Sequence, residues 1–206
     1  LDADTDGNEI AASGYTGSLT ITADDIDIDD ATHTQTIVGG SGVDTLEILS
    51  DAGNDAIAKE AIDDISGIDI FKFTQASGVT ARVDLELANE NATYTHASSY
   101  DSLTIDSTGT TGVATIDAKA EVDAKITINT GSGADVITTT KSVNFGDSIN
   151  SGAGNDDIKI HNGHLTSIDT INGGDGTGDE LINVDDTTLL DSAFTNVTNV
   201  ESITGT

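Results

Sequence analysis

The chain has 206 residues but contains no cysteine, proline, methionine or tryptophan, and only seven lysines and arginines in total. The lack of cysteine excludes disulfide bonds, thiolate metal sites and cysteine nucleophiles. The scarcity of basic residues argues against a nucleic-acid or anionic-membrane partner, since proteins bind both through clusters of Lys and Arg. No apolar run approaches the length that spans a membrane, so we expect no membrane insertion. No signal peptide is visible, and the start at Leu1 suggests a fragment or a processed product.

Acidic residues dominate the composition. There are 37 of them, 29 Asp and eight Glu, and the formal net charge is −30. The shorter carboxylate is favoured in turns and in compact cation sites, and so much like charge opposes folding unless cations neutralise it. Disorder is the alternative for such a chain. However, alternating runs rich in Ile and Thr, such as 103–105 and 125–128, predict β-strands.

One nine-residue pattern recurs along the chain: Gly-Gly-x-Gly-x-Asp-x-(large apolar)-x. Residues 39–47 fit it without a mismatch, 130–138 and 151–159 lack only the first Gly, and 173–181 carries one extra residue before its Asp. Residues 50–58 keep the second half, and 142–150 directly precedes 151–159 in the same phase. Repetition of this pattern predicts glycine-bent turns that bind Ca²⁺ through carboxylate and carbonyl oxygens, each followed by a short strand.

Two consecutive nonapeptides should make one full coil, so alternate copies should stack. Asp135, Asp156 and Asp179 are 21 and 23 residues apart, which fits a coil with a few inserted residues. A calcium ion between stacked turns would take one carboxylate from each. The alternative is a set of plain Asx turns without metal. The predicted ligands are Asp44, Asp55, Asp135, Asp156 and Asp179, with Gly39, Ser41, Thr130, Ser132, Ser151, Ala153, Asn155, Gly173 and Asp175 from the turns; Asp147 and Asp157 are further candidates.

Two other segments have a metal-like spacing. Asp2, Asp4 and Asp6 resemble the front of an EF-hand loop, but Ser13 stands where the twelfth-position Glu belongs, so the alternative is a solvated acidic linker. His161-x-x-His164 has a zinc-like spacing without a third ligand nearby, and we expect a surface loop there.

No catalytic motif is present. The sequence has no Gly-x-Ser-x-Gly elbow, no His-Glu-x-x-His and no phosphate-binding loop. We therefore expect a protein that is not an enzyme.

The pattern predicts an all-β fold. We expect parallel β-roll or β-solenoid segments with calcium-binding turns, further short strands, and one or two short helices, one of them at 56–65. Closed barrels and immunoglobulin-like sandwiches are the alternatives. A loose similarity between 37–46 and 171–181 suggests a lead-in at 1–36, one long repeat unit at 37–170 and the start of the next at 171–206. Alternatively, the whole chain is one continuous solenoid.

The nonapeptides resemble those of the RTX (repeats-in-toxin) proteins, which Gram-negative bacteria export by type I secretion. Within that family, the arrangement Gly-Gly…Asp-x-Leu…Val-x-Asn-Val-Glu-Ser-Ile at 173–203 is similar to surface-layer proteins and large repeat adhesins. The resemblance covers well under half of the chain. It implies export of an unfolded chain that folds outside the cell on meeting calcium. It also implies a carboxy-terminal secretion signal, which 197–206 does not match.

These observations predict a structural calcium-binding module of an extracellular bacterial surface-layer (S-layer) protein. Such a module would fold on binding calcium and associate with its own copies into a lattice, with lipopolysaccharide or another cell-surface glycan as a further partner. One alternative is an adhesin or filament module that binds a surface, a glycan or ice. Another is the RTX region of a larger secreted enzyme or toxin.

Overall fold

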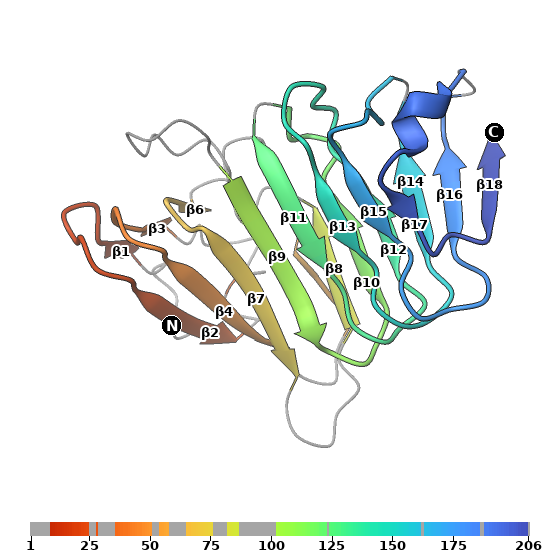
Figure 1. The fold of residues 1–206 in the computed structure, drawn as a ribbon. Coiled ribbons are helices and arrows are strands. Elements are labelled where there is room, and N and C mark those ends of the chain that lie inside the picture. The colour runs from red at the N-terminus through yellow and green to blue at the C-terminus, as the bar shows by residue number, and fades with distance from the viewer. Residues whose placement is uncertain are drawn as a thin grey trace.

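The computed structural model describes residues 9–24, 28, 36–50, 54–57, 65–75, 82–86, 102–122, 124–161, 163–185 and 188–205, and it describes no side chains for 54–57, 82 and 84. In this part of the chain nearly all regular structure is short β-strand, and every strand pair is parallel. The strands form a parallel β-solenoid, which confirms the predicted all-β class (Figure 1).

Two long sheets and one short sheet make up the solenoid. In spatial order, the eight-stranded sheet contains β17 (Val197–Thr198), β15 (Thr170–Asn172), β13 (Ser148–Asn150), β11 (Lys125–Asn129), β9 (Ser102–Gly109), β7 (Ile70–Gln75), β4 (Thr45–Ser50) and β2 (Thr20–Asp24). The seven-stranded sheet contains β18 (Ser202–Gly205), β16 (Glu180–Asn183), β14 (Asp157–Ile160), β12 (Val136–Thr138), β10 (Ala114–Asp117), β8 (Arg82–Glu86) and β5 (Asn54–Ile57). The short sheet contains β1 (Glu9–Ala11), β3 (Thr36–Val38) and β6 (Ile65–Ser66).

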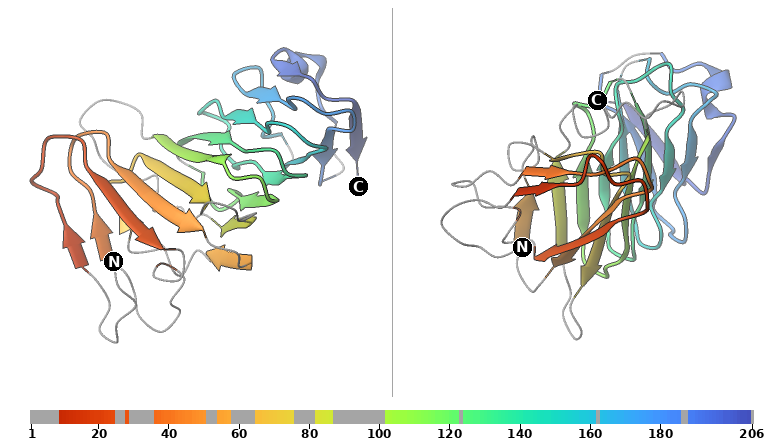
Figure 2. Two further views of the ribbon diagram at one scale, coloured as in Figure 1. Left: turned by 90° about the horizontal axis from the view of Figure 1, so that it is seen from below. Right: turned by 90° about the vertical axis from the view of Figure 1, so that its left-hand side faces the viewer.

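From β9 onward the chain alternates between the two long sheets. Each strand therefore pairs with the strand one coil later in the same sheet; Ile128 pairs with Ile149, and Ile149 with Ile171. Figure 2 shows the resulting stack, with the N-terminal strands at one end and the C-terminal strands at the other. Because β-strands stack at about 4.7–4.9 Å, a residue and its partner one coil later lie directly above each other.

The core contains two columns of large apolar side chains that face each other between the sheets. Each strand turns one face inward, and burying each Ile or Leu on that face contributes about 1.5–3 kcal/mol. The column on the eight-stranded sheet contains Ile21, Leu46, Phe71, Ile105, Ile128, Ile149, Ile171 and Val197. The column on the seven-stranded sheet contains Leu85, Ile116, Ile137, Ile158, Leu181 and Ile203.

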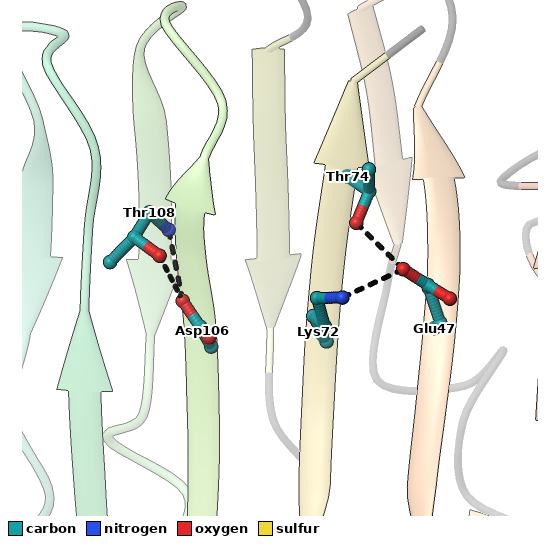
Figure 3. Close-up of polar contacts among 5 residues, drawn as sticks. All are labelled: Glu47, Lys72, Thr74, Asp106 and Thr108. Atoms are coloured by element: carbon teal, nitrogen blue, oxygen red, sulfur yellow. Dashed lines mark hydrogen bonds and ion pairs between the residues drawn. The ribbon is translucent and has the colours of Figure 1, made fainter. Parts of the chain in front are cut away.

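The outward face of the eight-stranded sheet is polar. Near its N-terminal end Glu47 accepts hydrogen bonds from Lys72 Nζ (2.8 Å) and Thr74 Oγ1 (3.0 Å), and Asp106 accepts two from Thr108 (Figure 3). These hydrogen bonds from Lys72 and Thr74 lower the pKa of the Glu47 carboxyl. Charged groups on this face are thus partly neutralised by their neighbours in the sheet.

The connections between the two sheets differ in length. From the eight- to the seven-stranded sheet the chain needs only residues 130–135, and one coil later 151–156. The return runs over 139–147, 161–169 and 184–196, and the last of these contains the 3₁₀ helix η2 (Asp191–Phe194). The return connections are therefore the longer ones.

The predicted helix at 56–65 is wrong at both ends. Its first two residues belong to β5 and its last residue begins β6, while 58–64 lie outside the described residues. Parallel pairing with β8 and β3 overrides the helical spacing of apolar residues there. Both long sheets run across the proposed boundary at 170/171, and the division into repeat units stays a prediction. In the described part of the chain no helix has the length and hydropathy to cross a membrane.

Candidate metal-binding turns

The aspartates of the predicted metal-binding turns lie immediately before strands. Asp135 precedes β12, Asp156 precedes β14 and Asp179 precedes β16. Side chains two positions apart point to the same face of a strand, so Asp135 faces inward together with Ile137. The three aspartates are consequently at most 1% exposed.

These aspartates form a continuous hydrogen-bonded column with Glu201, here called the seven-strand column. The backbone N–H of Ala114 donates to Asp135 Oδ1 (2.7 Å), and that of Asp135 donates to Asp156 Oδ1 (2.7 Å). The backbone N–H of Asp156 donates to Asp179 Oδ1 (2.9 Å), and that of Asp179 to Glu201 Oε2 (2.9 Å). Each carboxylate therefore ties its own coil to the coil before it.

The second oxygen of each aspartate in this column has no hydrogen-bond donor. Asp135 Oδ2, Asp156 Oδ2 and Asp179 Oδ2 are all buried, and none has a partner among the residues that the structure describes. Leaving a buried acceptor unsatisfied costs about 1–3 kcal/mol, more when the group is charged. Three such atoms at equivalent positions of successive coils therefore call for a ligand that supplies positive charge.

The glycine-rich turns explain why no amide reaches these oxygens. Gly154 has a φ of +141°, and a Cβ on it would lie 1.8 Å from the carbonyl oxygen of Gly133 in the coil below. This close stacking lets the turns pair with each other: Gly154 N donates to Asp175 O (3.1 Å), and Asp175 N to Gly152 O (2.7 Å). The turn amides are therefore engaged between coils rather than with the carboxylates.

Burial raises the pKa of two carboxyl groups in the seven-strand column, Asp135 and Asp156. Desolvation is the largest effect on Asp156, whose pKa rises to about 6 while neighbouring Asp135 and Asp179 add to the shift. The pKa of Asp135 is also raised by burial, against the lowering effects of the Ala114 amide and the Thr130 hydroxyl, and the Ser151 hydroxyl likewise lowers that of Asp156. Both hydroxyl groups donate their hydrogen bonds to backbone carbonyl oxygens, so neither satisfies an Oδ2 atom. Deprotonating these carboxyl groups without a cation therefore stores mutual repulsion in the folded state.

The turn with the complete sequence motif is arranged differently. The backbone amides of Leu19 and Gly40 donate to Asp44 Oδ1 and Oδ2, respectively, so both carboxylate oxygens are satisfied. Asp44 N in turn donates to Asp69 Oδ2 (2.7 Å). Asp44 precedes β4 and Asp69 precedes β7, and both strands belong to the eight-stranded sheet. This turn thus lies at the opposite corner from Asp135, Asp156 and Asp179.

Asp147 and Asp169 continue the arrangement at that corner; with Asp44 and Asp69 they are here called the eight-strand column. Asp147 accepts from Ile126 N (3.2 Å) and Thr140 Oγ1 (2.6 Å). Asp169 accepts from Asp147 N (2.8 Å) at one oxygen and from Thr166 N (2.7 Å) at the other. From Asp135 to Asp179 the column carboxylates therefore alternate between the two corners, as half-coil nonapeptides require.

Asp147 gives the metal-free protein a defined pH dependence. Burial raises its pKa from 3.8 to about 6, the Asp169 charge adds to the shift, and the Thr140 hydroxyl and Ile126 amide oppose it. The folded state then holds this proton more tightly than the unfolded chain, so the stabilisation is present below pH 4 and is lost as the pH rises through 6. As the pH rises through 6, the wild type should lose on the order of 2–3 kcal/mol of unfolding free energy through this group, and we expect Asp147→Asn not to show that loss. Urea unfolding in chelator at pH 4.5 and 7.5 measures it, and an equal pH slope in variant and wild type would contradict it.

The other predicted ligands are placed as follows. Asp157 is the first residue of β14, and its amide donates to Asp135 O (2.8 Å) while its side chain points outward. Beyond the residues or side chains that the structure describes lie Asp2, Asp4, Asp6 and the side chain of Asp55. The turns themselves contain Gly39, Ser41, Thr130, Ser132, Ser151, Ala153, Asn155, Gly173 and Asp175.

Some of these turn carbonyls already accept one hydrogen bond. Thr130 Oγ1 donates to Ser151 O (2.7 Å), and Ser151 Oγ donates to Gly173 O (2.7 Å). A carbonyl oxygen has two lone pairs, so each of these keeps one for a further ligand.

The sequence motif missed three carboxylates of the two columns. Asp69, Asp169 and Glu201 precede strands in turns that do not match the glycine pattern. A shorter pattern finds them all: an acid two positions before a large apolar residue, as in Glu201-Ser202-Ile203. Of these three carboxylates Asp169 is buried, Asp69 half-buried and Glu201 exposed.

The donor chemistry fits a hard cation. Carboxylate and carbonyl oxygens are what Ca²⁺ prefers, and the seven-strand column offers unsatisfied carboxylate oxygens beside carbonyl-rich turns. Within the described ranges no three His, Asp or Glu side chains converge as a metal site, so backbone carbonyls must complete any coordination. His161 Nδ1 instead lies 3.0 Å from Asp185 Oδ2, in a turn closed by a bond from His164 N to His161 O.

Comparison of the chain with protein-family models, with curated proteins and with solved structures gives no match. The class of the molecule is therefore defined by its own fold and site alone. It is a parallel β-solenoid with inward-facing carboxylate columns at its corners. The resemblance to RTX proteins rests on the motifs alone and stays a prediction.

Proposed function

We propose that this chain is a calcium-binding structural module. The observation that carries the proposal is the set of buried, unsatisfied oxygens on Asp135, Asp156 and Asp179 in consecutive coils. These three carboxylates would hold the ions, together with carbonyl oxygens of the turns 130–135, 151–156 and 173–179. Calcium accepts 6–8 oxygen ligands in flexible geometry, which suits sites built largely from backbone.

Charge supports the same proposal. The net charge of −30 opposes compaction, and a divalent ion in each turn would neutralise carboxylates where they are closest. Magnesium demands near-ideal octahedral geometry and keeps its waters, while nitrogen- and sulfur-seeking metals lack suitable ligands here. Calcium is therefore the divalent ion that these turns would favour.

We further propose that the module belongs to an extracellular bacterial surface protein of the S-layer type, secreted by a type I system and assembled laterally with its own copies. The motif resemblance supports the location, and the coupling of folding to an ion supports folding after export. Calcium bound to the folded state alone would stabilise it by mass action. A glycan of the cell surface is the proposed anchoring partner.

Calcium titration tests the proposed function. We expect excess Ca²⁺ to raise the melting temperature strongly over that in chelator, since each site contributes about 2.7 kcal/mol at a hundredfold excess over its Kd. Circular dichroism and scanning calorimetry measure the change, with Mg²⁺ at equal ionic strength as the control. A melting curve that is the same in calcium, magnesium and chelator would rule the proposal out.

An adhesive role is the second candidate, favoured by one uncharged part of the surface. On strands β11, β13 and β15 the outward positions align Thr127, Ser148 and Thr170 in one row. A parallel row contains Asn129, Asn150 and Asn172, and Asn172 Nδ2 donates to Asn150 Oδ1 (3.1 Å). Such an ordered, neutral array on a chain of −30 charge suits a ligand that repeats along the stack, such as a glycan or ice.

A further inference from the structure

The two carboxylate columns satisfy their oxygens in different ways. In the seven-strand column one oxygen each of Asp135, Asp156 and Asp179 lacks a donor among the described residues. In the eight-strand column Asp44 and Asp169 receive a donor at both oxygens. We infer that calcium binds only along the seven-strand column, and that the turn with the complete sequence motif, 39–44, binds none. This inference rests on the proposed function and specifies which turns carry it out.

In the turn at 39–44, backbone amides donate hydrogen bonds to both oxygens of Asp44. Gly40 N lies four positions before Asp44 and points at its Oδ2, while Leu19 N from the preceding coil takes Oδ1. Each oxygen of Asp44 keeps a lone pair, but a cation bound there would lie beside an amide N–H that points at the same oxygen and would be repelled by its partial positive charge. The two amides therefore already supply the positive partial charge that a cation would supply.

Asp147 and Asp169 accept hydrogen bonds from hydroxyl groups as well as from backbone amides. Thr140 Oγ1 occupies Asp147 Oδ2, and both the amide and the hydroxyl of Thr166 occupy Asp169 Oδ2. These short-range side-chain caps resemble those that satisfy turns without metal. The longer return connections provide the residues that make them.

In the seven-strand column the amide that corresponds to Gly40 N is oriented differently. By its place in the motif Gly40 corresponds to Gly174, whose N–H donates to Asn172 Oδ1 (3.1 Å) and not to Asp179. Gly174 and its counterpart Gly152 have positive φ angles of +88° and +82°, which Gly40 does not have. This difference in the backbone accompanies an Oδ2 atom without a donor on Asp156 and on Asp179.

Counting bound ions distinguishes the two columns. We expect Asp179→Asn to lower the number of calcium ions bound per chain by at least one in equilibrium dialysis, and Asp169→Asn to leave it unchanged. Asp169 is the matched control, because it is buried to a similar degree in the adjacent half-coil. Asp44→Asn is the second control, and each variant is measured below its own melting temperature, with the fold checked by circular dichroism.

The possible outcomes separate the inference from the proposed function. A lower calcium count in Asp44→Asn or Asp169→Asn, equal to that in Asp179→Asn, would overturn the inference while leaving calcium binding intact. An unchanged count in Asp179→Asn would overturn it in the same way. Absence of bound calcium in the wild-type protein would overturn both.

Discussion

Asp156→Asn is expected to stabilise the protein in chelator and to destabilise it in calcium. Without metal the substitution removes a buried charge whose pKa is raised to about 6, which should add on the order of 1–3 kcal/mol to the free energy of unfolding at pH 8. With excess calcium it removes a ligand, and a loss of about 3 kcal/mol follows from the loss of one site at a hundredfold excess over Kd. Denaturant unfolding in both conditions measures the two effects.

Asp157→Asn is the matched control for this reversal. It makes the same chemical change one residue further along the chain, where the side chain faces out of the sheet. We expect a change within about 0.5 kcal/mol in both conditions, as for surface substitutions in general. Destabilisation of Asp156→Asn by equal amounts in chelator and in calcium would mean that its carboxylate has a structural role only.

Gly154→Ala is expected to cost more than 3 kcal/mol of unfolding free energy. A Cβ there would lie 1.8 Å from Gly133 O, a backbone atom in the neighbouring coil that has nowhere to move, and φ is +141°. Overpacking and backbone strain each cost roughly 1–3 kcal/mol, and separating the turns would also break the amide pairing between them. Thermal unfolding measures the loss.

Substitutions at two other glycines separate the cost of backbone strain from the cost of overpacking between turns. Gly163 also has a positive φ, +69°, but a Cβ there meets nothing within 4 Å, so Gly163→Ala should show the strain alone, about 1–2 kcal/mol. Gly14 has open space and no positive φ, so Gly14→Ala should be neutral or slightly stabilising. If all three variants lost the same amount, close stacking of the turns would not be what requires glycine.

The solenoid was predictable because a motif that recurs at the spacing of its half-coils is visible in the sequence. Over residues 135–181 the first inward Ile or Leu of each strand follows an acid by two positions, and this pair recurs every half-coil, so strand direction, inward face and coil length there all follow from one motif. The helix predicted at 56–65, whose two ends are β-strand, shows the limit of this reasoning. Apolar spacing there suits a helix, but the edges of existing sheets offered pairing partners that no local pattern reveals.

The identity of the functional carboxylates was less predictable. Whether an oxygen is left without a donor depends on where the amides of the same turn point, and that depends on the coil below. Asp44 and Asp156 look equivalent in sequence, yet Gly40 N donates to the first carboxylate, while the corresponding Gly152 has a φ of +82° and Asp156 Oδ2 has no donor among the described residues. The same inward position is even aliphatic in two coils, at Leu103 and Ile126, both fully buried.

The unequal connections have a consequence for how this scaffold can be altered. The turns at 130–135, 151–156 and 173–179 touch their neighbours through backbone and differ by a single residue in length, so longer insertions there should break the stack. The return connections at 139–147 and 161–169 are longer, and the one at 184–196 is longer still without disturbing strand register. Foreign peptides should therefore be tolerated when grafted into that side, where they would be displayed in a row along the rod at the spacing of successive coils.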